Sequence, residues 1–363
     1  MPERLLRDWS TLASHPIAQP FVPLQCWKHF REHGWRFQVH SLYRNGNLVA
    51  VVPLAEGGRV FRRWRAPCHR EIGRVNFAFT GDPEEVLGLI LDRCLGPDGD
   101  VFEVPCVTAD SPTYSGLRQA AEQRRLRYVE DLSAEIPVVD LTAGWDAFWR
   151  AISPRTRREF GRRERQMEKA GILEFHEVHS ADVLEQVFSE CLEIEASGYK
   201  GERGTALLQR ETERKFWWSF ITHAAAAGCL ALYTLRLDGR LVSFDLCLKH
   251  NSVIFEMKHG TDVRLRPFSP GSVLHLKLFR REIEAGKCTL YDFAGETYEW
   301  KTRWTKERKR MFGLRIYSPC LRGRAAFTVG PGIRRAIKRV PGTYGLVAAA
   351  RQLRRRYRDV ARA

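Results

Sequence analysis

Two matching hairpin turns constrain the fold most strongly. The run Leu42–Val52 resembles the run Leu235–Asp245, and each contains an Asx-Gly pair, Asn45-Gly46 or Asp238-Gly239, between strand-like segments. Such pairs favour two-residue β-turns, because both turn residues must adopt positive φ. We therefore expect two hairpins in corresponding places of two similar halves.

A helix and a strand are predicted downstream of each hairpin. In the first half the helix opens at Pro83 and the strand begins at Val101; in the second they begin at Pro270 and Cys288. Both pairs of positions are 187 residues apart. The pattern predicts an α/β (α+β) fold of two tandem units, each a mixed, mostly antiparallel sheet flanked by helices. The expected units span residues 1–143 and 172–319, with a connecting helix at 144–171 and a tail at 320–363.

The net charge of +16 is concentrated in two segments. Residues 321–363 hold twelve of the 59 lysines and arginines against one acid, Asp359. Residues 155–169 hold seven basic residues and three glutamates, and Ser153-Pro154 is a helix start signal. Within this second segment five cations follow a 3-4-3-4 spacing that forms one helical stripe: Arg155, Arg158, Arg162, Arg165 and Lys169.

The tail has an apolar stripe beside its arginines, formed by residues that include Leu346, Leu353 and Tyr357. Such a helix can lie on anionic lipid or another polyanion, or it can pack on its own domain. The sequence leaves both alternatives open.

The two predicted helix starts differ in charge. A helix N-terminus preceded by glycine and hydroxyls binds phosphate through its free N–H groups. The second half offers Arg264, Arg266 and the run Ser269-Pro270-Gly271-Ser272 at this place, whereas the first half reads Asp82-Pro83-Glu84-Glu85. If one half binds a phosphate-bearing cofactor, we expect it to be the second.

Several other classes lack their motifs. The nine cysteines include no Cys-x-x-Cys pair, so neither a disulfide framework nor a metal site is expected. The sequence has no Gly-x-Ser-x-Gly elbow, Walker A loop or Gly-x-Gly-x-x-Gly fingerprint. No apolar run reaches the roughly 20 residues of a membrane-spanning helix, and the N-terminus lacks a secretory core. We expect a cytoplasmic protein, with peripheral contact at the inner face of the membrane as the alternative that the tail leaves open.

The second half resembles a known family. Ser269-Pro-Gly271 and Tyr291-Asp-Phe-Ala-Gly-Glu-Thr-Tyr298-Glu-Trp-Lys301 resemble the end of the BioF-like, or cellulose-biosynthesis CelD-like, acyltransferase domain. This family belongs to the GNAT superfamily and is related to the FemAB aminoacyltransferases. The resemblance extends from about residue 149 to 304 and includes the run from Glu195 to Ala206. The first half resembles a degenerate GNAT-like unit more loosely.

The resemblance implies acyl transfer from acetyl-CoA or another acyl-CoA, or aminoacyl transfer from tRNA, to an acceptor amine or hydroxyl. The helix start would then bind the cofactor through Arg266, Ser269, Pro270, Gly271 and Ser272. Proton transfer needs carboxylates or a phenol, and an oxyanion needs a cation. The catalytic candidates are Asp245, Glu256, Asp292, Tyr298 and Lys301, and the substrate-binding candidates are Arg158, Arg162, Tyr199 and Lys200. Asp292 as a turn cap, Tyr298 as a core aromatic and Asp245 as a solvent-facing strand residue stay open as structural alternatives.

Three functions are consistent with the sequence. The leading one is an acyl-CoA-dependent acyltransferase that acts on a small cell-envelope or polysaccharide precursor. The second uses aminoacyl-tRNA as donor, with the basic stripe and tail on the phosphates. The third is a non-catalytic protein that binds polyanions or a membrane surface.

Overall fold

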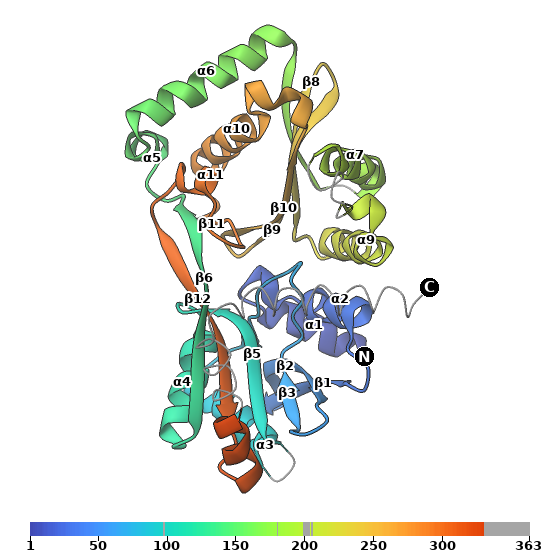
Figure 1. The fold of residues 1–363 in the computed structure, drawn as a ribbon, viewed down its shortest axis with the longest axis vertical. Coiled ribbons are helices and arrows are strands. Elements are labelled where there is room, and N and C mark those ends of the chain that lie inside the picture. Colours follow the sequence, from blue (N-terminus) through green and yellow to red (C-terminus); the bar gives the residue numbers. More distant parts are fainter. Residues whose placement is uncertain (97–98, 180, 199–203, 205, 330–363) are drawn as a thin grey trace, which may run out of the picture.

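The structure, a computed structural model, describes residues 1–96, 99–179, 181–198, 204 and 206–329. Figure 1 shows two lobes one above the other, with the first half of the chain in the lower lobe and the second half in the upper. A single twelve-stranded sheet runs through both lobes. None of the helices in the described ranges is long and apolar enough to cross a membrane.

The elements of the lower lobe begin with two helices that precede the first hairpin. They are α1 (Glu3–Leu12), η1 (Pro16–Ala18), α2 (Phe21–Phe30), β1 (Arg36–Arg44), β2 (Asn47–Gly57), β3 (Arg63–Arg65), β4 (Ala78–Phe79), α3 (Pro83–Cys94), β5 (Val101–Thr108), α4 (Pro112–Gln123) and β6 (Arg127–Asp140).

The elements of the upper lobe and the returning strand follow. They are α5 (Trp145–Ala151), α6 (Pro154–Ala170), β7 (Leu173–Val178), η2 (Ala181–Val183), α7 (Leu184–Ser197), η3 (Leu207–Gln209), α9 (Glu211–Ala226), β8 (Leu230–Leu237), β9 (Arg240–His250), β10 (Val253–Thr261), η4 (Val263–Phe268), α10 (Pro270–Ala285), β11 (Leu290–Asp292), α11 (Glu299–Thr302) and β12 (Arg308–Tyr317).

The predicted repeat of elements is confirmed. The hairpins β1–β2 and β8–β9 turn at Asn45 and Asp238, both with positive φ. The helices α3 and α10 begin at the two expected prolines. α10 connects the parallel strands β10 and β11, and α3 leads from β4 to β5, which pairs parallel with β3. The other strand pairs are antiparallel, so the predicted α/β class with a mostly antiparallel sheet is also confirmed.

Two long strands join the lobes. In β6, residues 127–137 pair with β12, and residues 138–140 pair with β11 of the upper lobe. The strand β12 lies between β5 and β6, so residues 308–317, which the sequence grouped with the second unit, complete the sheet of the lower lobe (Figure 1). The lobes therefore share their strands.

The upper sheet is buried on both faces. On one face α7 and α9 pack over β8 and β9, and Phe21 of α2 reaches α9, where it meets Phe220 edge to face with centroids 5.3 Å apart. On the other face α5, α6 and α10 contribute Phe148, Phe160 and Phe279 to one cluster. A separate cluster under α3 and α4 forms the core of the lower lobe.

The basic helix forms as predicted. It is α6, and the Ser153 hydroxyl accepts a hydrogen bond from the Thr156 amide at its start. Phe160 and Met167 are buried, and the Phe160 ring stacks on Trp304 at 4.1 Å. The tail begins with helical residues 321–329, whose Ala326 is buried on the lower lobe. The rest of the predicted tail helix lies outside the described residues.

Candidate functional site: a groove where β10 and β11 separate

A groove opens where two parallel strands stop pairing. β10 and β11 pair only over Val253–Phe255 and Leu290–Asp292; beyond this point β10 continues and the chain after β11 turns away. Between them lies a cavity of about 620 Å³, which is lined by strand β10, the turn after β11, and α11. The first half contributes Arg70 and Glu71 to the same cavity, so both lobes form its wall.

A β-bulge places two polar side chains on one face of β10. The pairing with β9 skips Met257, since Glu256 pairs with Cys247 and Lys258 with Leu246. Because of this extra residue, Glu256 and His259 share a face, which regular alternation would not allow. His259 Nδ1 lies 3.0 Å from Glu256 Oε1, and both residues line the cavity.

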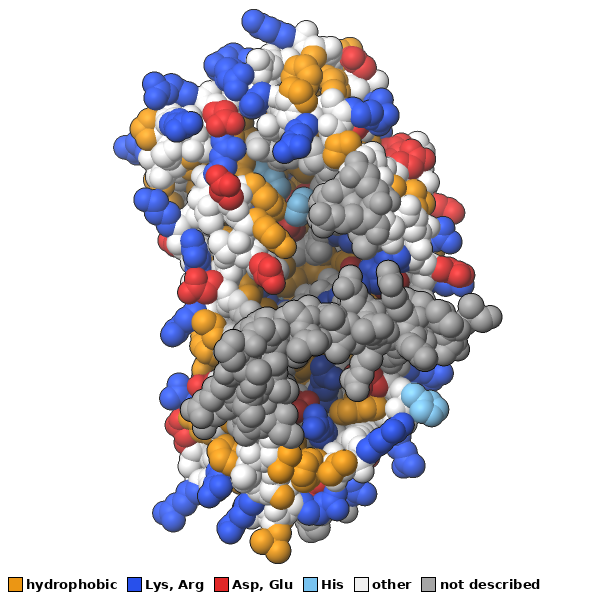
Figure 2. Space-filling model, viewed as in Figure 1, with side chains coloured by type: hydrophobic (Ala, Val, Ile, Leu, Met, Phe, Trp, Pro, Cys, Tyr) orange, Lys and Arg blue, Asp and Glu red, His pale blue; other side chains and the backbone are white. Residues whose placement is uncertain are grey.

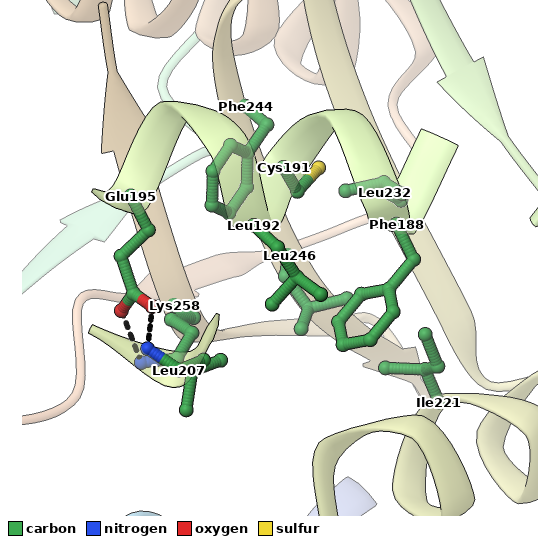
Figure 3. Close-up of a pocket in the computed structure, with 10 residues that line it drawn as sticks. All are labelled: Phe188, Cys191, Leu192, Glu195, Leu207, Ile221, Leu232, Phe244, Leu246 and Lys258. Atoms are coloured by element: carbon green, nitrogen blue, oxygen red, sulfur yellow. Dashed lines mark hydrogen bonds and ion pairs between the residues drawn. The ribbon is translucent and has the colours of Figure 1, made fainter. Parts of the chain in front are cut away.

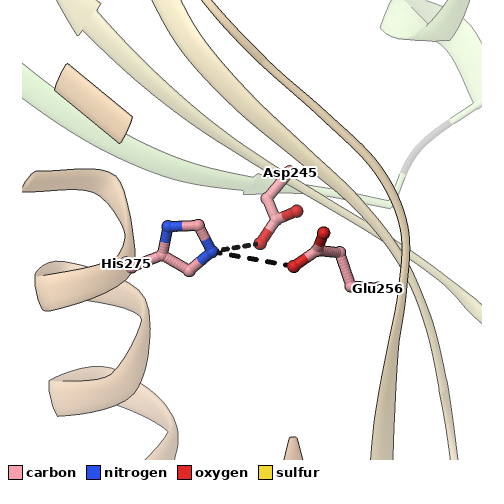
Figure 4. A group of neighbouring side chains, drawn as sticks. All are labelled: Asp245, Glu256 and His275. Atoms are coloured by element: carbon pink, nitrogen blue, oxygen red, sulfur yellow. Dashed lines mark ion pairs between the residues drawn. The ribbon is translucent and has the colours of Figure 1, made fainter. Parts of the chain in front are cut away.

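Glu256 belongs to a buried polar network, part of which Figure 4 shows. The Tyr291 hydroxyl donates to Asp245 Oδ2 at 2.5 Å and lies 3.1 Å from Glu256 Oε2. His275 Nε2 lies 3.3 Å from Asp245 Oδ2 and 3.9 Å from Glu256 Oε2. Its other nitrogen, Nδ1, donates to the Gly271 carbonyl at 2.8 Å, so the network reaches the start of α10.

The network is charged. Burial by itself lowers the pKa of His275, but Asp245 and Glu256 outweigh it and raise that pKa to about 10. Burial likewise opposes ionisation of Glu256, yet the Lys301 ammonium and hydrogen bonds from His259 and His275 hold its pKa well below the usual range. Asp245, Glu256 and His275 have the composition of a metal-ligand set. In the structure His275 Nε2 lies against both carboxylates, so we describe the cluster as an ion-pair network.

Lys301 anchors the turn after β11. Its ammonium donates to the carbonyls of Phe293 and Ala294 at 2.8 and 3.1 Å and lies 3.9 Å from Glu256 Oε1. It is 3% exposed. Tyr298 stands beside it at the start of α11, 53% exposed, and both residues line the groove.

Asp292 joins the lobes. It is 1% exposed, and its oxygens accept from Arg74 Nη1 and Nη2 at 2.5 and 3.2 Å. It also accepts from the Ala294 amide at 2.8 Å. The structure therefore places this candidate as a turn cap and a partner of the first half, and Asp292 is absent from the lining of the groove.

The start of α10 is open. Ser269 has a φ of 51°, in the left-handed region, and its side chain forms no capping bond. Among the described residues the Gly271 amide has no hydrogen-bond acceptor. A Cβ at Gly271 would lie 2.8 Å from Thr261 Oγ1, and Thr261 lines the groove, so only glycine lets the helix start approach the strand this closely.

The other cofactor candidates surround this helix start. Pro270 is buried as its first residue, Ser272 is half-buried, and Arg266 is exposed in the preceding η4. Arg264 is occupied, since its guanidinium binds Asp262 at 2.8 Å.

The substrate-binding candidates do not meet in the groove. Arg158 and Arg162 are exposed on the side of α6 opposite Phe160 and Met167. Tyr199 and Lys200 lie outside the described residues. Glu195, near the end of α7, is the nearest described part of the same motif with a charged partner. It accepts from Lys258 at 2.8 Å and from the Leu207 amide at 3.0 Å (Figure 3).

Comparison with known proteins agrees with this geometry. Residues 154–302 match the family model of the acetyltransferase (GNAT) domain. The second half is therefore similar to a GNAT-type acetyltransferase domain. A domain of this type supports a general acyl-transfer reaction. No curated protein matches the sequence.

The whole chain also resembles solved structures at low identity. FemX aligns with a TM-score of 0.61 and 13% identity over 89% of this chain and 98% of FemX. L-PGS from Bacillus licheniformis aligns at 0.55 and 12%, over 88% and 93%. The C-terminal domain (DUF2156) assigned to lysylphosphatidylglycerol synthetase from Agrobacterium fabrum aligns at 0.54 and 12%, over 89% and 94%. These likenesses show that the chain has the two-unit fold of FemX.

The sequence analysis missed several residues of the site, among them His275, Lys258, His259 and Arg74. His259 was missed because strict alternation puts it on the opposite face from Glu256, and no sequence signal marks the bulge. Arg74 lies 218 residues from its partner Asp292, in a segment with no regular pattern. A buried arginine among apolar residues was the one signal that could have flagged it.

Proposed function

We infer that the protein transfers an acyl group from an acyl-CoA to an amine or hydroxyl of a small acceptor bound in the groove. The observation that carries this proposal is the open start of α10 beside the groove. The donor's pyrophosphate would bind the Gly271 amide and the positive end of the helix, with Arg266 as a further cation.

The groove supports the remaining parts of the reaction. Where the strands separate, their backbone amides and carbonyls can bind the extended arm of an acyl-CoA donor. The cavity of about 620 Å³ is large enough for the thioester and a small acceptor together. Its walls carry charges of both signs, which include Glu71, Glu256 and Lys258. Such a lining favours a polar acceptor. A cell-envelope or polysaccharide precursor is the class that the family resemblance favours.

Calorimetric titration with acetyl-CoA, a longer acyl-CoA and free CoA tests the donor. We expect saturable binding to the wild type. Gly271→Glu should weaken it by at least about 100-fold, the equivalent of one or two lost charge-assisted hydrogen bonds. Arg266→Glu changes an exposed side chain and keeps the helix start, so it guards against misfolding and should weaken binding in the same direction. Absence of binding to the wild type would contradict the proposal.

The basic stripe on α6 favours a second candidate donor, aminoacyl-tRNA. The acids of this helix pair with cations on neighbouring elements: Glu159 with Arg303 at 2.7 Å and Glu164 with Lys277 at 2.9 Å. The exposed Glu168 lies 3.7 Å from the same Lys277. The five stripe cations therefore have no acidic partner among the described residues. Figure 2 shows basic side chains gathered on this end of the molecule. An unneutralised stripe suits a phosphate backbone or an anionic lipid surface.

Two assays separate these occupants. If tRNA is the donor, binding falls steeply with salt, and Arg158→Gln/Arg162→Gln/Arg165→Gln lowers the slope by about 0.7–0.9 for each lost phosphate contact. The matched control, Arg7→Gln/Arg59→Gln/Arg214→Gln, removes the same charge from exposed positions elsewhere. Binding to anionic vesicles that exceeds binding to tRNA would favour a membrane surface. If the protein binds neither tRNA nor anionic vesicles but still binds acyl-CoA, the proposal of an acyl-CoA donor stands.

A further inference from the structure

The groove contains one histidine held against a carboxylate. We propose that His259 is the general base that removes the acceptor's proton, and that Glu256 positions it. This inference rests on the acyl-transfer function proposed above and specifies which side chain performs its proton transfer.

The hydrogen bond between these residues determines which ring nitrogen can act. Because Glu256 is ionised, both of its oxygens only accept hydrogen bonds, so His259 Nδ1, at 3.0 Å, must carry the proton. In the neutral form of the ring, the remaining nitrogen, Nε2, is the one with the lone pair. The side chain is 41% exposed and lines the groove, where an acceptor can reach it. This is the donor–acceptor arrangement of a histidine oriented by a carboxylate.

The surroundings hold the dyad in place. The Trp300 ring meets His259 edge to face, with centroids 4.7 Å apart. On its other side Glu256 lies 3.9 Å from the Lys301 ammonium and 3.1 Å from the Tyr291 oxygen. A base whose orientation depends on packed neighbours loses little entropy when substrate binds.

The other charged groups near His259 have different partners. Lys258, its chain neighbour, contacts Glu195 at 2.8 Å and Glu71 at 3.8 Å across the groove. His275 and Asp245 face Glu256 from α10 and β9. The further titratable groups in the lining are Arg70, Tyr298 and Lys301.

The carboxylates themselves are poorly placed to be the base. Asp245 and Asp292 are 0% and 1% exposed, and each is already bonded to a buried donor. Glu256 is 3% exposed, and its low pKa makes it a weak proton acceptor. The lining carboxylates Glu71 and Glu195 are paired with Lys258. His259 combines access to the groove with a ring nitrogen, Nε2, that is not held by Glu256.

The proposed step balances for an amine acceptor. An ammonium gives one proton to His259 Nε2, and the amine nitrogen forms a bond to the thioester carbonyl carbon. The carbon–sulfur bond then breaks, the second nitrogen proton goes to the departing thiolate, and the products are an amide and free CoA thiol. His259 returns its proton to water.

An alkylating donor analogue tests the position without knowledge of the acceptor. Bromoacetyl-CoA should bind as a donor and alkylate His259 Nε2 with loss of bromide, as mass spectrometry of the digested protein would show. Acetyl-CoA should protect the residue. His259→Gln should lose this modification, whereas His176→Gln, which changes an exposed histidine outside the groove, should react like the wild type.

The outcomes separate the two levels of the proposal. If bromoacetyl-CoA competes with acetyl-CoA but modifies another residue or none, His259 does not face the reacting carbon and the inference is wrong. If neither thioester binds, the proposed acyl-CoA function fails and the inference fails with it.

A second measurement tests the role of Glu256. In ¹⁵N-histidine spectra the neutral His259 ring of the wild type should be the Nδ1–H tautomer. Glu256→Gln should shift the tautomer ratio toward Nε2–H and slow the alkylation of His259 by about tenfold. This is less than the roughly 10²–10⁴-fold contribution of a general base, because the imidazole itself stays in place. An unchanged tautomer and rate in a folded Glu256→Gln protein would overturn the positioning role.

Discussion

The two halves begin their corresponding helices in opposite ways. In α3 the Asp82 carboxylate accepts from the Glu85 amide at 3.0 Å, so the helix caps itself with its own negative charge. In α10 the Ser269 side chain forms no cap and the Gly271 amide is open. A helix start that is already neutralised has little affinity for phosphate, whereas an uncapped start retains its partial positive charge. One fold therefore yields one binding half and one supporting half.

The two halves also differ where their parallel strands, β3–β5 and β10–β11, stop pairing. In the first half the chain keeps contact with β5 beyond the end of β3. The Ala66 amide donates to the Glu103 carbonyl at 2.9 Å, and the Val75 amide donates to the Cys106 carbonyl at 2.7 Å. The segment from Ala66 to Val75 therefore covers the edge of β5. A cavity of about 320 Å³ remains near α3, but ion pairs of Arg74 and Lys309 lie in its wall. In the second half the chain after β11 turns away from β10 once their pairing ends, so the groove stays open. The lesson is that small local substitutions, more than topology, distinguish the halves.

The largest expected effect on stability comes from breaking the Arg74–Asp292 ion pair between the two halves. Arg74→Met leaves the buried Asp292 carboxylate without its partner, and we expect the free energy of unfolding to fall by about 3–5 kcal/mol. Denaturant unfolding measures the loss. The double variant Arg74→Met/Asp292→Leu should recover most of it. A loss below about 1 kcal/mol for the single variant would mean that the pair does not hold the lobes together.

Alkaline pH should weaken the second half through His275. The folded protein keeps this proton up to a pKa of about 10, whereas the unfolded chain releases it near 6.5. The folded state therefore binds the extra proton between these values, and the free energy of unfolding falls as pH rises through this window. The slope approaches about 1.4 kcal/mol per pH unit at most. Unfolding curves from pH 7 to 10 test it, and His275→Gln should show a flatter profile; equal slopes would refute the charged network.

The smallest effect compares the two caps directly. Asp82→Ala should cost about 1 kcal/mol of stability, because it removes a working N-cap. Ser269→Ala should change stability by less than about 0.5 kcal/mol, since that side chain caps nothing. Thermal unfolding of both variants measures the difference, and Asp82→Ala should leave acyl-CoA affinity unchanged. A larger loss from Ser269→Ala would reverse the comparison.

Much of the fold could be predicted from local signals. The hairpins, the starts of α3 and α10, and the basic helix each depend on residues close in sequence, and all are confirmed. The insertion of β12 between β5 and β6 could not be predicted, because its pairing joins segments about 170 to 220 residues apart and has no local signature.

The site was predictable only in part. Glu256, Lys301, Tyr298 and Gly271 line or adjoin the groove, because the family resemblance locates this region of the chain. The bulge at Met257 and the pairing of Arg74 with Asp292 depend on tertiary packing, so they required the structure. The roles of the candidate residues stay predictions for the experiments above.

The central claim is that the start of α10, and no other helix start, holds the donor's phosphates. Selective ¹⁵N-glycine labelling tests this most directly, through the amide signals of Gly271 and, in the first half, Gly81 and Gly88 during titration with CoA. We predict that the Gly271 signal moves progressively to saturation, as expected for an amide that gains a phosphate acceptor, while the other two stay fixed. A Gly271 signal that does not move while CoA saturates the protein, or movement of Gly81 or Gly88 in its place, would contradict the account.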